Sequence, residues 1–133
     1  MNVDFAFVCD YAEAAGKINA LGIGFDTIFA PRVPAIHPIF GFVMQLRANV
    51  VEAGTKRLEI HLIDDDGAEV IPPLRSNIEM KRPEEGMESV AKIALHFGQV
   101  KFPRYGQYSL RAVLDGNQVA AVALSVKPPP QPQ

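Results

Sequence analysis

The chain of 133 residues lacks tryptophan and carries one cysteine, Cys9. A single cysteine excludes an intrachain disulfide and every cysteine-rich zinc site. No apolar run approaches the roughly 18 to 20 residues that cross a bilayer as a helix, and the first residues lack the basic and apolar regions of a signal peptide. We therefore expect a cytoplasmic protein, in which Cys9 is a small buried hydrophobe in a strand.

Positive charge is not in excess either. The 13 Lys and Arg residues are outnumbered by 15 Asp and Glu residues, and the formal net charge is −2. Nucleic-acid binding needs a basic patch or stripe, and binding to an anionic membrane surface needs clustered Lys or Arg. We therefore expect neither nucleic acid nor a membrane as a partner.

Catalytic and metal-binding motifs are also missing from the sequence. No serine lies in a G-x-S-x-G elbow, and "GIGFDTI" does not fit the phosphate-binding pattern G-x-G-x-x-G. The three histidines, His37, His61 and His96, do not have the spacing of a zinc motif. We therefore expect that the protein is not an enzyme, and we assign no catalytic, cofactor-binding or metal-binding residue and no cofactor.

What the sequence does contain is a period of two in hydrophobicity, which is typical of half-buried β-strands. From Phe42 to Val50 every second residue is apolar, and the opposite face includes Val43. Three further stretches alternate in the same way: residues 56–63, 106–114 and 118–126. The Asp-Gly pair between the last two predicts a tight hairpin, whereas the prolines in "PRVPAIHP" predict a connection or a protected edge.

Residues 83–97 allow two interpretations. Met87, Val90, Ala91, Ala94 and Leu95 fit the apolar stripe of a short amphipathic helix, whereas Ile93, Leu95 and Phe97 fit one face of a strand. We favour the strand because every neighbouring segment has a period of two. The helix remains the alternative.

About eight short strands and no clear helix predict an all-β fold, an antiparallel immunoglobulin-like β-sandwich of the Greek-key type. One domain is expected over residues 1–127. Residues 128–133 are rich in proline, and we expect them to form a disordered tail.

The segment "FPRYGQYSLRAVLDGNQVAAVALSV" resembles the last two strands of immunoglobulin-like sandwiches. Its G-x-Y-x-L unit, residues 106–110, resembles the tyrosine corner of those domains. The resemblance implies that the Tyr108 hydroxyl bonds back to the backbone where the strand begins. Leu110 stands where antibody domains carry a cysteine, so apolar packing replaces their disulfide.

Residues 1–127 also resemble a family of uncharacterised bacterial proteins. The resemblance is carried by "CDYAEAAGKINALGIGFDTI", "HPIFGFVMQLR", "IDDDG" and "FPRYGQYSLRAVLDG". It implies a fold shared with that family and no activity.

The aspartates of "IDDDG", Asp64, Asp65 and Asp66, are the one cluster with the chemistry of a metal site. A calcium-binding EF-hand loop needs oxygen ligands at positions 1, 3 and 5, Gly at position 6 and Glu at position 12. With Gly67 at position 6, positions 1 and 12 are leucine and proline, which provide neither ligand. We therefore predict a hairpin turn, with a weak calcium site that borrows ligands from another loop as the alternative.

The sandwich topology also places this turn at the same end as the connection that contains Lys101 and Arg104. We expect these cations to compensate the charge of the aspartates.

These observations favour a non-enzymatic protein-interaction or structural module, which binds a protein partner or a second copy of itself through a sheet edge, a sheet face or a loop end. The alternative is a sandwich that binds a small ligand or a carbohydrate. Carbohydrate sites usually expose aromatic side chains, and Tyr11 and Tyr105 are the expected candidates.

Overall fold

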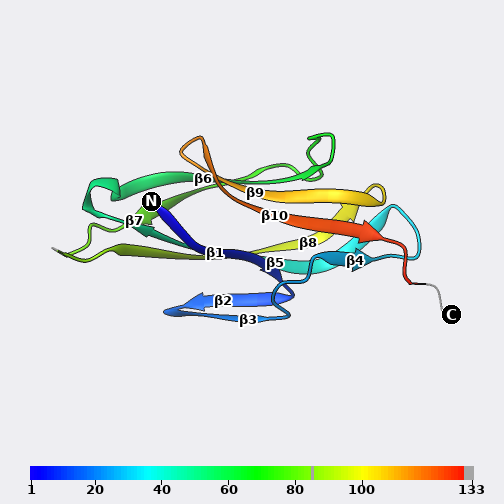
Figure 1. Ribbon diagram of the computed structural model, residues 1–133, viewed down its shortest axis with the longest axis horizontal. Helices are drawn as coiled ribbons and strands as arrows, with labels where there is room; N and C mark the ends of the chain where they lie inside the picture. Colours follow the sequence, from blue (N-terminus) through cyan, green and yellow to red (C-terminus); the bar gives the residue numbers. More distant parts are fainter. Residues whose placement is uncertain (85, 131–133) are drawn as a thin grey trace.

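The structure is a computed structural model that describes residues 1–84 and 86–130, and it is all-β (Figure 1). The described residues form ten strands and one 3-10 turn, η1 (Val50–Glu52). The strands are β1 (Asn2–Cys9), β2 (Tyr11–Ala15), β3 (Lys17–Leu21), β4 (Thr27–Phe29), β5 (Ala35–Ala48), β6 (Gly54–Asp64), β7 (Leu74–Met80), β8 (Ser89–Phe102), β9 (Gly106–Leu114) and β10 (Asn117–Lys127).

The strands build two sheets that face each other and a separate hairpin (Figure 1). One sheet has the order β1-β5-β8 and the other the order β4-β10-β9-β6-β7, while β2 pairs only with β3. Every pairing is antiparallel except that of β4 with β10, which is parallel. The fold is therefore all-β as predicted, but the sheets are not purely antiparallel, and the strand count of about eight was too low. The short strands β2, β3 and β4 lie in a glycine-containing stretch whose turns were not resolved from sequence.

The main core lies between the two sheets, and the alternating pattern of the sequence fills it. From β5, Phe42, Met44 and Leu46 are fully buried, and they pack in one cluster with apolar side chains of the facing sheet. Val50 departs from the predicted alternation because it lies in η1, which begins at an Asn49 cap, and its side chain is exposed. For the other residues of the long strands, the faces that the alternation predicted to point into the core are confirmed.

The hairpin of β2 and β3 forms a third layer on the outer face of the three-stranded sheet (Figure 1). Beneath it lies a second small core of Cys9, Ala12 and Val43. Burial raises the pKa of the Cys9 thiol, and the prediction that Cys9 is buried in a strand is confirmed. Val43 was expected on an open face, but it is 0% exposed because the hairpin covers that face.

Of the two interpretations of residues 83–97, the strand is the one that the structure shows. β8 runs from Ser89 to Phe102, and Ile93 and Phe97 are buried on its inner face. The helical alternative is wrong for the residues described, which exclude Glu85.

At the C-terminus, β10 ends at Lys127, and residues 128–130 have no regular secondary structure. Residues 131–133 lie outside the described residues, so the disorder of the tail stays a prediction. No helix within residues 1–84 and 86–130 has the length and hydropathy needed to span a membrane.

The connection before β9 is fixed by the predicted tyrosine hydrogen bond. The Tyr108 hydroxyl donates to the carbonyl of Arg104 at 2.6 Å and accepts from the Arg104 backbone N–H at 3.3 Å. The Tyr108 ring is 3% exposed and packs edge-on against Phe102, with 5.0 Å between ring centroids. One hydroxyl therefore satisfies both backbone groups of a residue in a turn.

Replacing this hydroxyl should destabilise the protein measurably. We expect Tyr108→Phe to lower the free energy of unfolding by about 1 kcal/mol, since the ring stays packed while two hydrogen bonds are lost. The matched control is Tyr11→Phe, whose hydroxyl bonds only an exposed glutamate at 3.3 Å. Urea denaturation measures both variants. Equal stability of Tyr108→Phe and Tyr11→Phe would contradict the role assigned to this hydroxyl.

Candidate functional site

The aspartate turn, residues 64–66, closes the end of β6 as a hairpin-like turn. The Asp64 carboxylate accepts the backbone N–H groups of Asp66 and Ala68, both at 2.9 Å. Gly67 has a φ of 84°, a left-handed conformation that glycine adopts without strain. One carboxylate of the cluster is thus used to shape the chain, as the prediction of a turn requires.

Arg104 pairs with all three aspartates and compensates part of their charge. Its Nη2 atom lies 2.7 Å from an Asp65 oxygen, 2.9 Å from an Asp66 oxygen and 3.3 Å from an Asp64 oxygen. The guanidinium lowers the pKa of Asp65. The predicted meeting of the two loops is therefore confirmed for Arg104, whereas Lys101 forms no ion pair with the described residues.

The same three carboxylates are the one group of metal-ligand type among the described residues, with ligand atoms within 4.8 Å of one another. A guanidinium already lies against the oxygens that a cation would need, and its positive charge opposes cation binding. The geometry thus favours a turn held by the Arg104 ion pairs over a calcium site.

Removing the guanidinium tests this interpretation. Arg104→Met should lower the melting midpoint at neutral pH, and the difference from wild type should shrink towards about pH 3. The reason is that Asp65, whose pKa is depressed in the folded state, contributes stability above its unfolded pKa and loses it as pH falls through the folded pKa. Lys101→Met, a lysine outside the cluster, is the control.

Calcium provides the second arm of the same experiment. Because a ligand that binds the native state raises the melting midpoint, millimolar calcium should leave the wild-type midpoint unchanged. An upward shift in wild type would establish the calcium site instead.

The three histidines lie on different strands and have different partners. His37, on β5, is half-buried beside Phe40, and burial lowers its pKa. His96, on β8, accepts the backbone N–H of Ala12 at 3.2 Å and stacks on Tyr11, so it anchors the hairpin. Each ring is therefore placed by packing with its own neighbours.

His61 lies between two carboxylates on the outer face of β6. Its Nδ1 atom is 2.8 Å from Glu69 and its Nε2 atom is 3.3 Å from Glu59, which also pairs with Arg75 at 3.1 Å. These hydrogen bonds raise the pKa of His61. The ring thus joins β6 to the segment that leads to β7.

The two contacts of His61 with Glu59 and Glu69 should make the free energy of unfolding depend on pH. A raised folded-state pKa contributes stability that is complete below the unfolded pKa of about 6.5 and is lost as pH rises through the folded pKa. The difference in free energy of unfolding between wild type and His61→Gln should therefore be largest near about pH 5 and decline towards about pH 9. His37 is present in both proteins, so its opposite contribution cancels. A difference that does not vary with pH would refute this.

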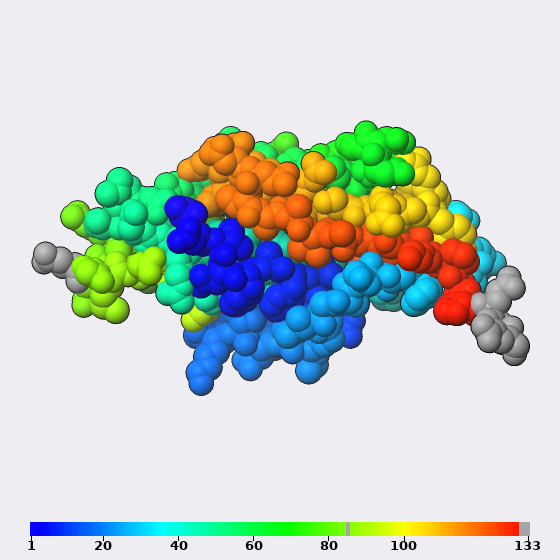
Figure 2. Space-filling view, viewed as in Figure 1, coloured from blue at the N-terminus to red at the C-terminus, as the bar shows by residue number. Residues whose placement is uncertain are grey.

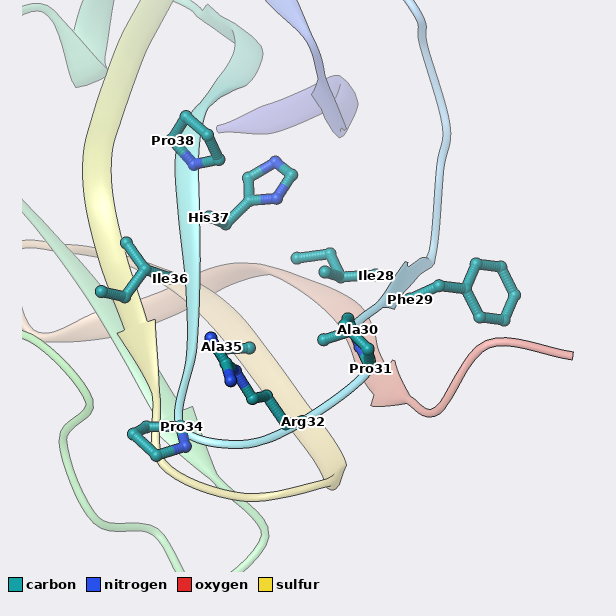
Figure 3. Close-up of a pocket in the computed structure, with 10 residues that line it drawn as sticks. All are labelled: Ile28, Phe29, Ala30, Pro31, Arg32, Pro34, Ala35, Ile36, His37 and Pro38. Atoms are coloured by element: carbon teal, nitrogen blue, oxygen red, sulfur yellow. The ribbon is translucent and has the colours of Figure 1, made fainter.

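A groove that sequence reasoning missed lies between β4 and the beginning of β5 (Figure 3). Its volume is about 440 Å³, and we call it the β4–β5 groove. It is lined by Ile28, Phe29, Ala30, Pro31, Arg32, Pro34, Ala35, Ile36, His37 and Pro38. The proline-rich stretch in this segment predicted only a connection or an edge, because nothing local in it reveals what lies opposite.

Two strand edges border the β4–β5 groove. β1 pairs with β5 only as far as Gly41, so the first part of β5 pairs with β8 alone. β4 likewise pairs only with β10. Within the described part of the chain, one edge of each segment thus carries no neighbouring strand.

The groove has an apolar floor and exposed apolar rims. Ile28, Ala30 and Ala35 are buried at its floor. Phe29 is 55% exposed and Ile36 is 60% exposed, and in Figure 3 their side chains point to opposite sides. The combination of apolar surface and open strand edges makes this the strongest candidate for a binding site.

Residues 4–127 match a family of unknown function, DUF6941. The chain belongs to this family. The match covers nearly the whole predicted domain, so the expected membership of a family without a named activity is confirmed, and the bacterial origin of the family stays a prediction. None of the curated proteins matches the chain.

Proposed function

We propose that this DUF6941 chain is a non-enzymatic, cytoplasmic protein-interaction module, an immunoglobulin-like sandwich that binds an extended segment of a partner protein in the β4–β5 groove. The observation that carries the proposal is an apolar-floored groove bordered by two strand edges. An edge offers backbone N–H and C=O groups to an added strand, while pockets beside it select side chains.

The arrangement of the strands supports the immunoglobulin-like sandwich. The chain crosses from one sheet to the other between β5 and β6, returns between β7 and β8, and crosses again before β9. The tyrosine hydrogen bond at the start of β9 is the feature that accompanies this topology in immunoglobulin-like domains. The parallel pairing of β4 with β10 closes the five-stranded sheet at the edge where the groove lies.

The lining of the groove supports binding without catalysis. It contains one titratable ring, His37, whose pKa is lowered by burial. Among the described lining residues there is no serine, cysteine, aspartate or glutamate that would act as nucleophile or acid with it. The free, buried Cys9 supports the cytoplasmic part of the proposal, because this domain needs no oxidising compartment to fold.

A small ligand is the second candidate, since a volume of about 440 Å³ lies within the usual range of ligand sites, about 300 to 1,000 Å³. The two tyrosines expected to serve a carbohydrate are already engaged, however. Tyr11 stacks on His96, and the Tyr105 hydroxyl donates to the carbonyl of Ala30 at 2.8 Å. These contacts favour a peptide over a sugar.

Selection from a random heptapeptide library displayed on phage, with the whole chain as bait, tests the proposal. We expect peptides whose affinity falls about tenfold or more in the double variant Phe29→Ser/Ile36→Ser, because two exposed apolar anchors of roughly 1 kcal/mol each are lost. Val51→Ser is the control, because Val51 is 88% exposed but lies in η1, outside the groove. Anisotropy of labelled synthetic peptides measures affinity, and circular dichroism confirms folding.

The other outcomes are equally definite. No selected peptide, or peptides that bind the double variant as well as wild type, would reject the proposal. A melting shift with a glycan or metabolite panel in that case would support the small-ligand alternative. Light scattering identifies a second copy as the partner if the mass exceeds the 14.5 kDa of one chain and the double variant restores that mass.

A further inference from the structure

We infer that the β2–β3 hairpin is a pH-sensitive cover, which closes over the three-stranded sheet while the His96 ring is neutral and opens when that ring is protonated. Opening uncovers the outer face of the sheet around Cys9 and Val43. The cover is independent of the proposed function, because no residue of the hairpin lines the β4–β5 groove.

The hairpin has few apolar contacts that hold it closed. β2 and β3 span five residues each and pair only with each other, and a lone two-stranded hairpin is marginally stable in water. Among residues 11–21, all of which the structure describes, Ala12 alone is buried, and Ile18 and Ala20 are partly buried. A single polar contact with the sheet can therefore change the open population measurably.

The polar contact at Ala12 requires a neutral histidine. The His96 Nε2 atom accepts the Ala12 backbone N–H at 3.2 Å, so this nitrogen carries no proton in the closed hairpin. Protonation makes it a donor that faces another donor, and the Ala12 N–H then loses its acceptor in a residue that is 2% exposed. Opening the hairpin lets both groups bond to water.

Gly41 makes the room in which this contact forms. Cys9, Gly41 and His96 are in register on β1, β5 and β8, so they lie in one row across the same face of the sheet. A Cβ atom at Gly41 would lie 3.0 Å from the Cys9 Sγ atom and 3.5 Å from His96 Nε2. The glycine thus leaves space beneath the hairpin for both the thiol and the ring.

Other titratable groups surround the ring without replacing it as acceptor. Those of the hairpin and of the sheet near it are Cys9, Asp10, Tyr11, Glu13, Lys17, His37 and Lys92. The two carboxylates favour an imidazolium and the two lysines oppose it, while the Tyr11 ring, stacked at 4.7 Å between centroids, also attracts a cation. Among the described residues, none of them accepts the Ala12 N–H in place of His96.

The direction of the pH effect follows from the open state. A released imidazole titrates near about pH 6.5, whereas the closed hairpin holds the ring neutral. Below about pH 6.5 the open state binds a proton that the closed state does not, so the open population rises by up to about tenfold per pH unit. Above that pH the open population stays constant.

Cys9 is a built-in probe of opening, because it is the single cysteine and is 0% exposed in the core beneath the hairpin. Its labelling rate with a pyridyl disulfide, divided at each pH by the rate for glutathione, should rise about tenfold between about pH 8 and pH 5. In His96→Gln, whose amide oxygen can accept the same N–H but does not titrate, this ratio should stay constant. His37→Gln is the matched control and should keep the wild-type pH dependence.

Three results would overturn the inference: a ratio that does not vary with pH in wild type, an unchanged pH dependence in His96→Gln, or its loss in His37→Gln. Labelling at pH 5 that accelerates with urea as steeply as global unfolding does would also overturn it, since a local opening exposes little surface.

If His96→Gln does not fold, hydrogen exchange of the Ala12 amide in the wild type decides the question. Corrected for the intrinsic exchange rate at each pH, the protection of this amide should fall about tenfold between about pH 8 and pH 5. Protection that stays constant would refute the opening of the hairpin by acid. Circular dichroism and the melting midpoint check that each variant is folded.

Discussion

The burial of β5 on both faces is the constraint on which the rest of the structure depends. Phe42 and Met44 point into the core between the sheets, while Val43 between them is covered by the β2–β3 hairpin. All three side chains are fully buried, so the middle of this strand cannot move without opening two cores. The strand thereby fixes the three-stranded sheet between two other layers. Figure 2 shows the edge strand of this sheet, β1 (dark blue), between β10 (orange) and the β2–β3 hairpin (lighter blue).

The same strand creates the candidate site, because it is longer than its neighbour. β5 spans 14 residues and β1 spans 8, and their pairing ends at Gly41. Beyond that point the chain leaves β1 to build the hairpin and returns only as the short β4, at the edge of the opposite sheet. A gap between two sheet edges, with core side chains as its floor, is the result.

Arg104 is held at the loop end through both its side chain and its backbone. Arg104 is held at 2.7 Å from Asp65, and the backbone of the same residue is held by Tyr108. Its guanidinium therefore serves the architecture of the turn.

Several features followed from local sequence because their physics is local. A period of two placed the long strands and their buried faces, an Asp-Gly pair marked the last hairpin, and the G-x-Y-x-L unit carried the resemblance that implied the Tyr108 hydrogen bond. The compensation of the aspartate turn by Arg104 was also expected, since it needed only the order of the strands. Membership of a family of unknown function confirmed the resemblance of the chain to such a family and added no activity.

What the sequence by itself determined about this protein is therefore where the long strands lie, which of their faces is apolar, and where the aspartate turn and the last hairpin are. Tertiary structure alone decided that Val43 is covered, that β4 runs parallel to β10 and that a groove opens beside β5. The physical reason is that alternation records the two faces of one strand, whereas cover and open edges depend on segments far apart in the chain. Whether a lysine forms an ion pair is decided in the same way, because its carboxylate partner can come from a segment far away in the chain.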